Sequence, residues 1–332
     1  MPIDWKPLAE IIHSHQRFVL TTHVRPDADA IGSELGMHGI LTHLGKSVQI
    51  VNASATPARL KFLDPANRVQ QLGVGVTEQQ ALDTDVHMVL DTSAWGQLAE
   101  VGNLFRKTSA VKVCIDHHAS AEDIGAINFK DVQAEATGSL IVKAAEALGA
   151  PLTLEMARAL YCAIATDTGW FRFPSTTADT MRIIAQLIDA GARPDLLYQE
   201  LFERNTPGRI KLSARVLGRI RLECEGRLGW TYVRWDDYSE TGSEPADTEE
   251  LVNTCLTIAG TQAAFICIEQ SNSSIKTSFR SRYPLDISQV AERFKGGGHR
   301  QAAGAVLPGP LADAESKVLA AIRTVLFGES PA

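Results

Sequence analysis

Acidic and imidazole side chains follow the first apolar run of the sequence, Phe18 to Thr22, which has the length and composition of a buried strand. His23 comes directly after this run, and Asp27 and Asp29 follow shortly afterwards. In open parallel sheets, the loops after the strands converge at one edge, and ligands bind there. These side chains are therefore candidate ligands, although Asp27 and Asp29 are equally suited to capping a helix at Ala30 to His43.

Three further apolar elements end in the same kinds of side chain. They are a strand at 87–90 followed by Asp91, a strand at 111–115 followed by Asp116, His117 and His118, and a helix at 155–166 followed by Asp167. Any one of these residues could be an ordinary polar residue at the end of an element. Four such ends that carry only Asp and His form a set of metal ligands.

The donor types narrow the choice of metal. Imidazole and carboxylate donors without thiolates disfavour structural zinc, which prefers cysteine-rich tetrahedral sites. Mixed nitrogen and oxygen donors suit two octahedral divalent ions, with Mn²⁺ first and Mg²⁺ or Co²⁺ as alternatives. Two such ions about 3.5–4 Å apart activate a water and hold a phosphate during in-line displacement.

The elements that must position these residues alternate between strands and helices over the first two hundred residues. Strands are expected at 18–22, 47–52, 87–90 and 111–115, and helices at 30–43, 138–148 and 155–166. This alternation predicts an α/β fold with a doubly wound parallel sheet. We assign residues 1–203 to this N-terminal, metal-binding catalytic domain.

The sequence changes character after this region. A basic stretch, RNTPGRIKLSARVLGRIR, predicts a linker helix over residues 204–221. Strands are then expected at 228–235, 263–270 and 274–280, and helices at 248–259 and 312–326. Residues 222–332 are therefore predicted to form a smaller C-terminal α/β domain.

Composition excludes several classes of protein. The chain has 332 residues, of which 45% are hydrophobic, and this excludes a disordered or fibrous chain. The net charge of −7 argues against binding of long duplex nucleic acid, which requires a basic surface. No apolar run is long enough to cross a membrane, and the N-terminus does not resemble a secretory signal, so a cytoplasmic protein is expected. The five cysteines form no Cys-x-x-Cys pair and are expected to be reduced and buried.

Ordered motifs across the chain resemble the DHH phosphoesterase superfamily. The resemblance rests on Asp116-His117-His118 after a strand, on His23-x-x-x-Asp27-x-Asp29 upstream, and on Gly296-Gly297-Gly298-His299 near the C-terminus. Further motifs resemble the bacterial branch that combines nano-RNase (short oligoribonuclease) and pAp phosphatase activity, namely Gly32-Ser33-x-x-Gly36, Thr137-Gly138, Thr166-Asp167-Thr168-Gly169 and Arg204-Asn205-Thr206. The match covers nearly the whole chain.

The resemblance implies a division of the ligands between two metals. One metal is assigned His23, Asp27 and Asp91, and the other Asp29, Asp91, His117 and Asp167, with Asp91 bridging. His118 is implied to face the substrate phosphate, as an electrostatic partner or as an acid near the leaving oxygen. Asp116 either orients its neighbours or closes its loop as a hydrogen-bond acceptor.

The resemblance implies that the C-terminal domain binds the substrate, with the active site in the cleft between the two domains. The glycines Gly296, Gly297 and Gly298 let backbone N–H groups approach an anion or a base closely. His299 is suited to stacking on a base and Arg300 to contacting a phosphate. Near the end of a strand, Arg280 and Arg282 suit bidentate phosphate capture; the alternative is that they lie on a solvated strand edge.

The resemblance implies a metal-dependent phosphoesterase that converts short single-stranded oligonucleotides to mononucleotides and 3′-phosphoadenosine 5′-phosphate (pAp) to AMP. Two alternatives use the same metal ligands: a phosphodiesterase acting on linear or cyclic dinucleotides, and an inorganic pyrophosphatase. A third is a catalytically silent nucleotide-binding protein, which the clustered carboxylates argue against because they need metal or protons to neutralise them. The sequence leaves a homodimer open.

Overall fold

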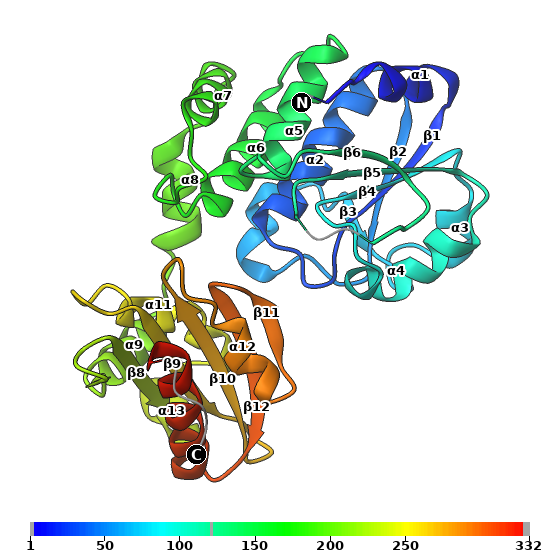
Figure 1. Cartoon of the computed structure of the whole chain (residues 1–332). Helices are drawn as coiled ribbons and strands as arrows, with labels where there is room; N and C mark the ends of the chain where they lie inside the picture. The colour runs from blue at the N-terminus through cyan, green and yellow to red at the C-terminus, as the bar shows by residue number, and fades with distance from the viewer. Residues whose placement is uncertain (1–2, 120–121, 328–332) are drawn as a thin grey trace. The chain divides into compact units, whose positions relative to one another are not determined.

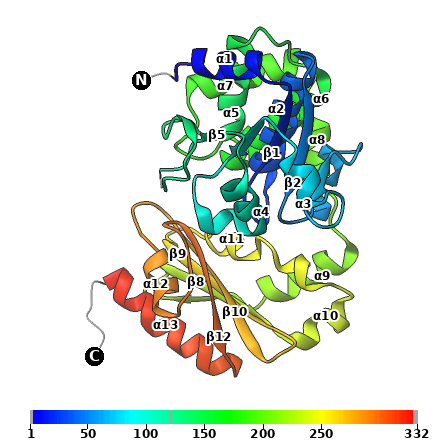
Figure 2. The same ribbon diagram turned by 90° about the vertical axis from the view of Figure 1, so that its right-hand side faces the viewer.

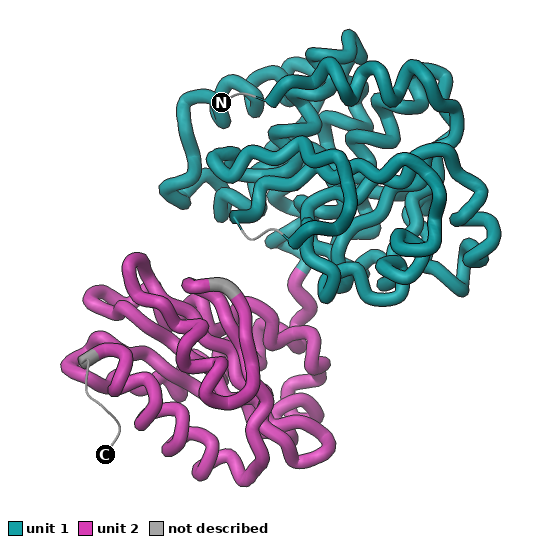
Figure 3. The backbone as a smooth tube through the Cα atoms, turned by 45° about the vertical axis from the view of Figure 1, so that its right-hand side comes forward, with its two compact units in different colours: residues 1–204 teal, residues 205–332 magenta. Residues whose placement is uncertain are grey.

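The computed structural model describes residues 3–119 and 122–327. The chain divides into two compact units, residues 1–204 and residues 205–332, coloured separately in Figure 3. Within the described residues, no helix combines the length and apolar character needed to cross a membrane.

A parallel sheet of six strands forms the centre of unit 1. The strands are β1 (Arg17–Thr21), β2 (Ser47–Asn52), β3 (Val69–Gln71), β4 (Val86–Leu90), β5 (Val111–Asp116) and β6 (Ile127–Lys130). Their order is β3-β2-β1-β4-β5-β6. From the central strand β1 the chain adds β2 and β3 on one side, and it then crosses to the other side of β1 to add β4, β5 and β6. This order confirms the predicted doubly wound sheet and places its topological switch point between β1 and β4, where ligands bind in such folds.

Different helices cover the two faces of this sheet (Figure 1). The helices of unit 1 are α1 (Lys6–Ser14), α2 (Ala28–His43), η1 (Ala58–Leu63), α3 (Glu78–Leu82), α4 (Trp95–Lys107), α5 (Thr137–Ala147), α6 (Leu154–Asp167), α7 (Ala178–Asp189) and α8 (Pro194–Phe202). Phe18 and Leu20 of β1 belong to the core that contains α2, α5 and α6. Val19, which points the opposite way, packs with Ala81 of α3 and Leu104 of α4. Both faces of β1 are therefore buried, which explains its continuous apolar run.

Glycines on α2 allow this helix to lie close against α6. A β-carbon at Gly32 would lie 2.4 Å from the carbonyl oxygen of Ala159, and one at Gly36 would lie 2.6 Å from the side chain of Leu160. The first separation is to a backbone atom and is not sterically possible, so the packing requires glycine at position 32, whereas a β-carbon at position 36 would need the Leu160 side chain to move. The first turn of α2 carries Asp29, and α6 ends at Asp167, so this packing sets the distance between two candidate ligands.

Unit 2 contains a second six-stranded sheet, of mixed direction. Its strands are β7 (Arg221–Glu223), β8 (Leu228–Val233), β9 (Ala263–Glu269), β10 (Ser274–Ser281), β11 (Gly297–His299) and β12 (Ala302–Pro308), in the order β11-β12-β10-β9-β8-β7. The pair β8–β9 is parallel and the other pairs are antiparallel.

The helices of unit 2 cover both faces of its sheet (Figure 2). They are α9 (Pro207–Leu217), α10 (Trp235–Thr241), η2 (Pro245–Thr248), α11 (Leu251–Cys255), α12 (Ser288–Arg293) and α13 (Leu311–Phe327). One core packs α12 and α13 against residues such as Phe265 of β9. The other packs α9 and α11 against Ile266, the next residue along the same strand.

Three sequence expectations differ from the structure of unit 2. The helix expected over residues 248–259 is divided into η2 and α11, because Glu250 between them adopts a left-handed φ of 67°. The strand expected over 228–235 ends at Val233, and α10 begins at Trp235. Residues 204–221, expected as a linker helix, contain α9 and the start of β7, and α9 packs within unit 2, where Arg215 pairs with Asp237.

Candidate metal centre

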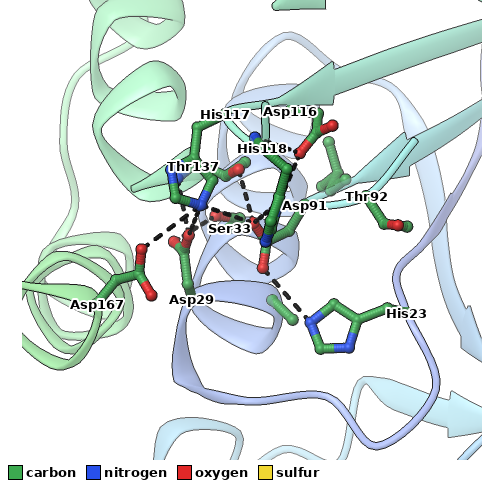
Figure 4. Close-up of polar contacts among 12 residues, drawn as sticks. His23, Asp29, Ser33, Asp91, Thr92, Asp116, His117, His118, Thr137 and Asp167 are labelled. Carbon is green, nitrogen blue, oxygen red and sulfur yellow. Dashed lines mark hydrogen bonds and ion pairs between the residues drawn. The ribbon is translucent and has the colours of Figure 1, made fainter. Parts of the chain in front are cut away.

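The candidate ligands converge at the carboxyl edge of the unit 1 sheet (Figure 4). His23 follows β1, Asp91 follows β4, and His117 follows β5, so three neighbouring strands of the sheet each contribute a side chain. Asp29 comes from the first turn of α2, and Asp167 from the end of α6. The structure thus brings together residues that lie up to 144 positions apart, as their places after strands and helices predicted.

These side chains form two groups that share Asp91. His23 Nε2 lies 3.5 Å from Asp91 Oδ2 and 3.9 Å from Asp27 Oδ1. His117 Nε2 lies 3.6 Å from the other Asp91 oxygen, 3.8 Å from Asp29 Oδ2 and 3.5 Å from Asp167 Oδ2.

These separations exceed ordinary hydrogen bonds. They suit donors arranged about a shared ion, since ligands about 2.1 Å from one metal lie roughly 3–4 Å from each other. The His23, Asp27 and Asp91 group and the Asp29, His117 and Asp167 group are each compact enough to hold a metal ion.

Both candidate imidazole ligands present the same nitrogen to the centre. His23 Nδ1 lies 3.1 Å from the carbonyl oxygen of Val24, and His117 Nδ1 lies 3.1 Å from that of Ala134. A carbonyl can only accept, so Nδ1 carries the proton in the neutral ring and Nε2 keeps its lone pair. Metal-binding histidines are oriented by this kind of backbone contact.

Asp27 and Asp29, which were both candidates for capping α2, have different roles. Asp27 is the N-cap, and its Oδ1 accepts from the N–H groups of Asp29 and Ala30 at 3.0 and 3.1 Å. Asp29 is buried, and its two oxygens accept from the N–H groups of Thr137 and Gly138, both at 2.8 Å. The N-terminus of α5 therefore holds the Asp29 carboxylate, as helix N-termini commonly hold anions.

Thr137 also contacts Asp91, the candidate ligand common to both groups, because its hydroxyl donates to Asp91 Oδ1 at 2.8 Å. A β-carbon at Gly138 would lie 2.7 Å from the β-carbon of Ala163 and 3.3 Å from Asp29 Oδ1. These two residues were noticed in the sequence only as part of a motif. Their contact with Asp29 and Asp91 was not predicted, and the Thr-Gly pair at the start of an apolar helix was the available signal.

Asp91 lies in an unusual backbone conformation. Its φ is +63°, in the left-handed region that non-glycine residues seldom adopt, and its side chain is 2% exposed. Such a conformation costs about 1–3 kcal/mol and persists where the surrounding structure imposes it, commonly at functional sites. The turn directs the carboxylate back between the two histidines, so each of its oxygens faces one imidazole.

Burial and mutual repulsion disfavour ionisation of this carboxylate cluster. Burial first, and then Asp29, Asp27 and Asp167, raise the pKa of Asp91 well above its usual value. Burial and the neighbouring acids Asp29, Asp27 and Glu135 raise the pKa of Asp167 to about 8. A bound cation would remove this penalty, so the donor set fits divalent metal ions.

Metal-free protein is expected to lose thermal stability as the pH rises from about 4 to about 8. Because the folded-state pKa values of Asp29, Asp91 and Asp167 are raised, their contribution to stability is complete below the unfolded pKa near 4 and is lost as the pH rises through the folded pKa. For Asp167 that loss is nearly complete at about pH 8. Saturating Mn²⁺ should abolish the dependence, and melting temperatures in EDTA and in Mn²⁺ across this range test it. An EDTA profile that does not change with pH would contradict the prediction.

Asp116, the last residue of β5, forms hydrogen bonds with His118 and with the ammonium group of Lys130. The side chain is fully buried. Its Oδ1 accepts from the His118 N–H at 3.0 Å and lies 2.8 Å from His118 Nδ1. Its Oδ2 accepts from Ser93 Oγ at 2.7 Å and from Lys130 Nζ at 2.8 Å. Although burial acts in the opposite direction, hydrogen bonds from His118, Lys130 and Ser93 hold the pKa of Asp116 below its usual value. The same contact raises the pKa of His118. Ser93 and Lys130 were not identified from the sequence, since neither stands beside Asp116 in the chain.

The substrate-binding candidates lie in unit 2, on or next to β10 and β11, which are separated by β12. Arg280 of β10 and His299 of β11 are both in register with Ala302 of β12, so the two positions lie at the same level of the sheet. Arg280 is half-buried on β10, which lies inside the sheet and not at its edge, whereas Arg282, just beyond the strand, is exposed to solvent. Arg280 donates to Asn253 Oδ1 at 3.1 Å, and Arg282 donates to backbone carbonyl groups of Thr261 and Leu256 at 3.2 and 2.6 Å.

The glycine loop approaches the neighbouring strand closely. A β-carbon at Gly296 would lie 2.1 Å from the carbonyl oxygen of Gly304, and Gly298 has a φ of +143°. Gly297 lies between them at the start of β11, and Arg300 after the strand pairs with Asp286 at 3.2 Å. Gly296 and Gly298 are thus required by the local backbone packing, whereas a β-carbon at Gly297 would meet no neighbouring atom.

Comparisons with known proteins agree with this architecture. The model of the DHH family, N-terminal domain, matches residues 17–164, and the DHHA1 domain model matches residues 230–326. The bifunctional oligoribonuclease and PAP phosphatase NrnA of Thermus thermophilus is 30% identical over 92% of this chain and 89% of its own length. The Bacillus subtilis protein of the same name is 26% identical over 90% of this chain and 91% of its own length.

A solved structure has the same fold. It is an exopolyphosphatase-related protein from Bacteroides fragilis, which superposes with a TM-score of 0.90 at 24% identity and covers 96% of this chain and 95% of its own. The two domain models lie in the two units, one in each, and the Thermus thermophilus relative is similar over nearly its full length. The chain belongs to the DHH family, in the branch that contains the NrnA proteins.

Proposed function

We propose that this protein is a metal-dependent phosphoesterase that hydrolyses short oligonucleotides to mononucleotides and pAp to AMP. The observation that carries the proposal is the pair of ligand groups that share Asp91, one carboxylate oxygen facing each histidine. The relatives named bifunctional oligoribonuclease and PAP phosphatase support the choice of substrates.

Two divalent ions are proposed, with Mn²⁺ first because the donors combine imidazole and carboxylate. His23, Asp27 and Asp91 would hold one ion, and Asp29, Asp91, His117 and Asp167 the other. When bound, such a pair supplies an activated water and neutralises charge on the phosphate. The protein orients the ligand side chains. Backbone carbonyl groups hold both histidine rings, and the N–H groups at the start of α5 hold the Asp29 carboxylate.

His118 is proposed as the residue that faces the substrate phosphate. Asp116 engages His118 Nδ1, so the ring is oriented and Nε2 is the atom that can act on the leaving oxygen. The raised pKa of His118 favours the protonated form, which can donate a proton or stabilise negative charge. Ser93 and Lys130 hold Asp116 in turn.

Unit 2 is proposed to bind the nucleotide through residues on its sheet. They are Arg280, Arg282, Gly296, Gly297, Gly298, His299 and Arg300. The common register of Arg280 and His299 with Ala302 supports this grouping, because it places a cationic position and an imidazole position at one level. Burial lowers the pKa of Arg280, so a phosphate beside it would be favoured by an incompletely solvated positive charge.

A Mn²⁺-dependent hydrolysis panel tests the function. It compares pAp, a dinucleotide, a 5-mer, a 24-mer, cyclic dinucleotides and inorganic pyrophosphate. We expect kcat/KM to fall about tenfold or more from the 5-mer to the 24-mer, and more steeply at low salt, because the net charge of −7 repels a long strand. A protein with an extended basic groove would instead gain about 1–3 kcal/mol for each further stacked base.

Each contrary result identifies a different enzyme. Equal turnover of the 24-mer and the dinucleotide would place the protein with exonucleases acting on long single strands. Preference for pyrophosphate or for cyclic dinucleotides over pAp and the short oligonucleotides would support the alternative phosphohydrolases.

A further inference from the structure

A series of buried hydrogen bonds lies behind the metal centre, in residues that the proposed chemistry does not use. Asn52, the last residue of β2, accepts from the Thr22 N–H through Oδ1 at 3.1 Å and donates from Nδ2 to Glu34 Oε2 at 2.8 Å. The Thr22 hydroxyl donates to the carbonyl oxygen of Leu90 at 2.8 Å. The side chains of Thr22, Asn52 and Glu34 are all 0% exposed. We call these three residues the buried bridge.

The buried bridge joins the elements that carry the ligands. The pairing of β1 with β4 ends at Thr21 and Val89, at the switch point of the sheet. The Thr22 hydroxyl adds one further connection beyond this ladder, and it reaches Leu90, which directly precedes Asp91. Thr22 itself directly precedes His23. The connection therefore spans the two backbone positions next to the ligands whose Nε2 and Oδ2 atoms lie 3.5 Å apart.

Hydrogen-bonding roles within the buried bridge are determined by chemistry. The Thr22 N–H can only donate, so the Asn52 oxygen must face it and the Asn52 amide nitrogen must face Glu34. Burial raises the pKa of Glu34 to about 8, although its hydrogen bond from Asn52 acts in the opposite direction. Glu34 is therefore mostly neutral near pH 7 and can be retained in the core as an acceptor.

We propose that Thr22, Asn52 and Glu34 are positioning residues that set the spacing of His23 and Asp91, and thereby the affinity of the metal site that contains His23. This inference rests on the proposed metal-dependent function. Groups that orient metal ligands typically change metal affinity or activity about 10–100-fold when they are removed. The buried bridge contacts the segments that carry His23 and Asp91. Its loss should therefore lower the metal affinity of the His23 site more than that of the site that contains Asp29 and Asp167.

Thr22→Val tests the proposal, since valine has the shape of threonine without its hydroxyl. Mn²⁺ binding is measured from the electron paramagnetic resonance signal of the free ion. One of the two sites is expected to weaken about tenfold or more. At saturating Mn²⁺, kcat should recover and KM for pAp should be unchanged, whereas Thr22→Ser should bind Mn²⁺ as the wild type does.

Thr231→Val is the matched control. Thr231 is also 0% exposed, and its hydroxyl donates to the carbonyl oxygen of Val216 at 2.6 Å, within unit 2. Both substitutions remove one buried hydroxyl together with its hydrogen bond to a backbone carbonyl oxygen. The control should lower the melting temperature by a similar amount and leave Mn²⁺ affinity unchanged.

Exchange of the amide and the carboxyl group provides a second, independent measurement. Asn52→Asp removes the amide donor to Glu34 and makes two buried acids share a proton, so Mn²⁺ affinity should fall. Adding Glu34→Gln restores a donor and an acceptor with their roles exchanged, and the double variant should recover much of the affinity. This arm keeps the proposal testable if Thr22→Val does not fold.

The outcomes separate the two proposals. A wild-type protein that binds no Mn²⁺ would contradict the proposed function itself. A wild type that binds two ions, together with a Thr22→Val variant that loses stability as Thr231→Val does but keeps both affinities, would overturn the positioning role. Failure of the double variant to exceed Asn52→Asp in Mn²⁺ affinity would also overturn it.

Discussion

Replacement of Asp91 by asparagine is expected to lower kcat/KM for pAp by about 10³ or more, because several kcal/mol of transition-state stabilisation depend on both metals. Each oxygen of this carboxylate faces a different histidine, so one substitution weakens both ligand groups. Asparagine keeps the shape of the side chain and tolerates the left-handed backbone at φ +63° better than most residues. The loss would therefore report the charge and the shared coordination rather than a distorted turn.

The same substitution should leave the metal-free protein as stable as the wild type, or make it more stable. Burial and three neighbouring acids raise the pKa of Asp91, so its ionised form is unfavourable without metal, and a neutral amide removes that repulsion. Melting temperatures in EDTA and rates in Mn²⁺ are the two measurements. A variant that keeps more than about a tenth of the wild-type rate, a difference below about 1.4 kcal/mol, would exclude the bridging role.

Asp237→Asn is the matched control for Asp91. Asp237 is also almost fully buried, at 1% exposed, but it pairs with Arg215 and Arg219 in unit 2. Its removal leaves two guanidinium groups without their shared partner, so the melting temperature should fall while metal binding is retained. The two variants thus have opposite expected effects on stability and on metal-dependent hydrolysis.

Loss of the His118 side chain is expected to lower kcat by about 10²–10⁴-fold, the usual contribution of a positioned acid or base. Because neither of the two proposed ligand groups includes His118, and Asp116 engages its Nδ1, His118→Ala is expected to bind two Mn²⁺ ions as tightly as the wild type. Asp116→Asn should have a smaller effect on kcat, about 10–100-fold, because it removes only the group that orients the ring.

The structure also allows an alternative in which His118 is itself a metal ligand. Asp91, His117 and His118 are close enough to hold an ion together, with His118 Nδ1 lying 3.8 Å from Asp91 Oδ1. If His118 were a ligand, His118→Ala would release Mn²⁺ and excess Mn²⁺ would restore part of the rate. Calorimetric titration of the variant with Mn²⁺, run beside Asp116→Asn, distinguishes a ligand from a group that acts on substrate.

Much of the sheet and of the ligand set could be predicted because strands buried on both faces are continuous apolar runs, and their ends are marked by a change to charged residues. β2 was placed at its observed bounds, and β1 and β4 within one residue at either end. The short strands β3 and β6 were missed because three or four residues carry too little periodicity.

Contacts between distant segments were beyond this kind of reasoning. The α5 amides that hold Asp29 lie more than a hundred residues after it, and only the crossover topology places them there. Similarly, the carbonyl groups that accept hydrogen bonds from Arg282 lie in the segment after α11. The sequence does not reveal these partners, so a solvated strand edge was left open as an alternative. Residue types were enough to predict metal binding, whereas the groups that hydrogen-bond to the candidate ligands depend on the tertiary structure.

The contact of Asp29 with Thr137 and Gly138 also bears on how the protein folds. It joins positions 108 and 109 residues apart, so the centre cannot assemble until β4, β5 and α5 have all docked on β1. Contacts of such high sequence separation form late, after the loop-closure entropy of the intervening chain has been overcome. Interactions absent from the folding transition state act mainly on the unfolding rate. Bound metal should therefore slow unfolding far more than it accelerates folding, and the resistance of the metal-loaded protein to heat would be largely kinetic.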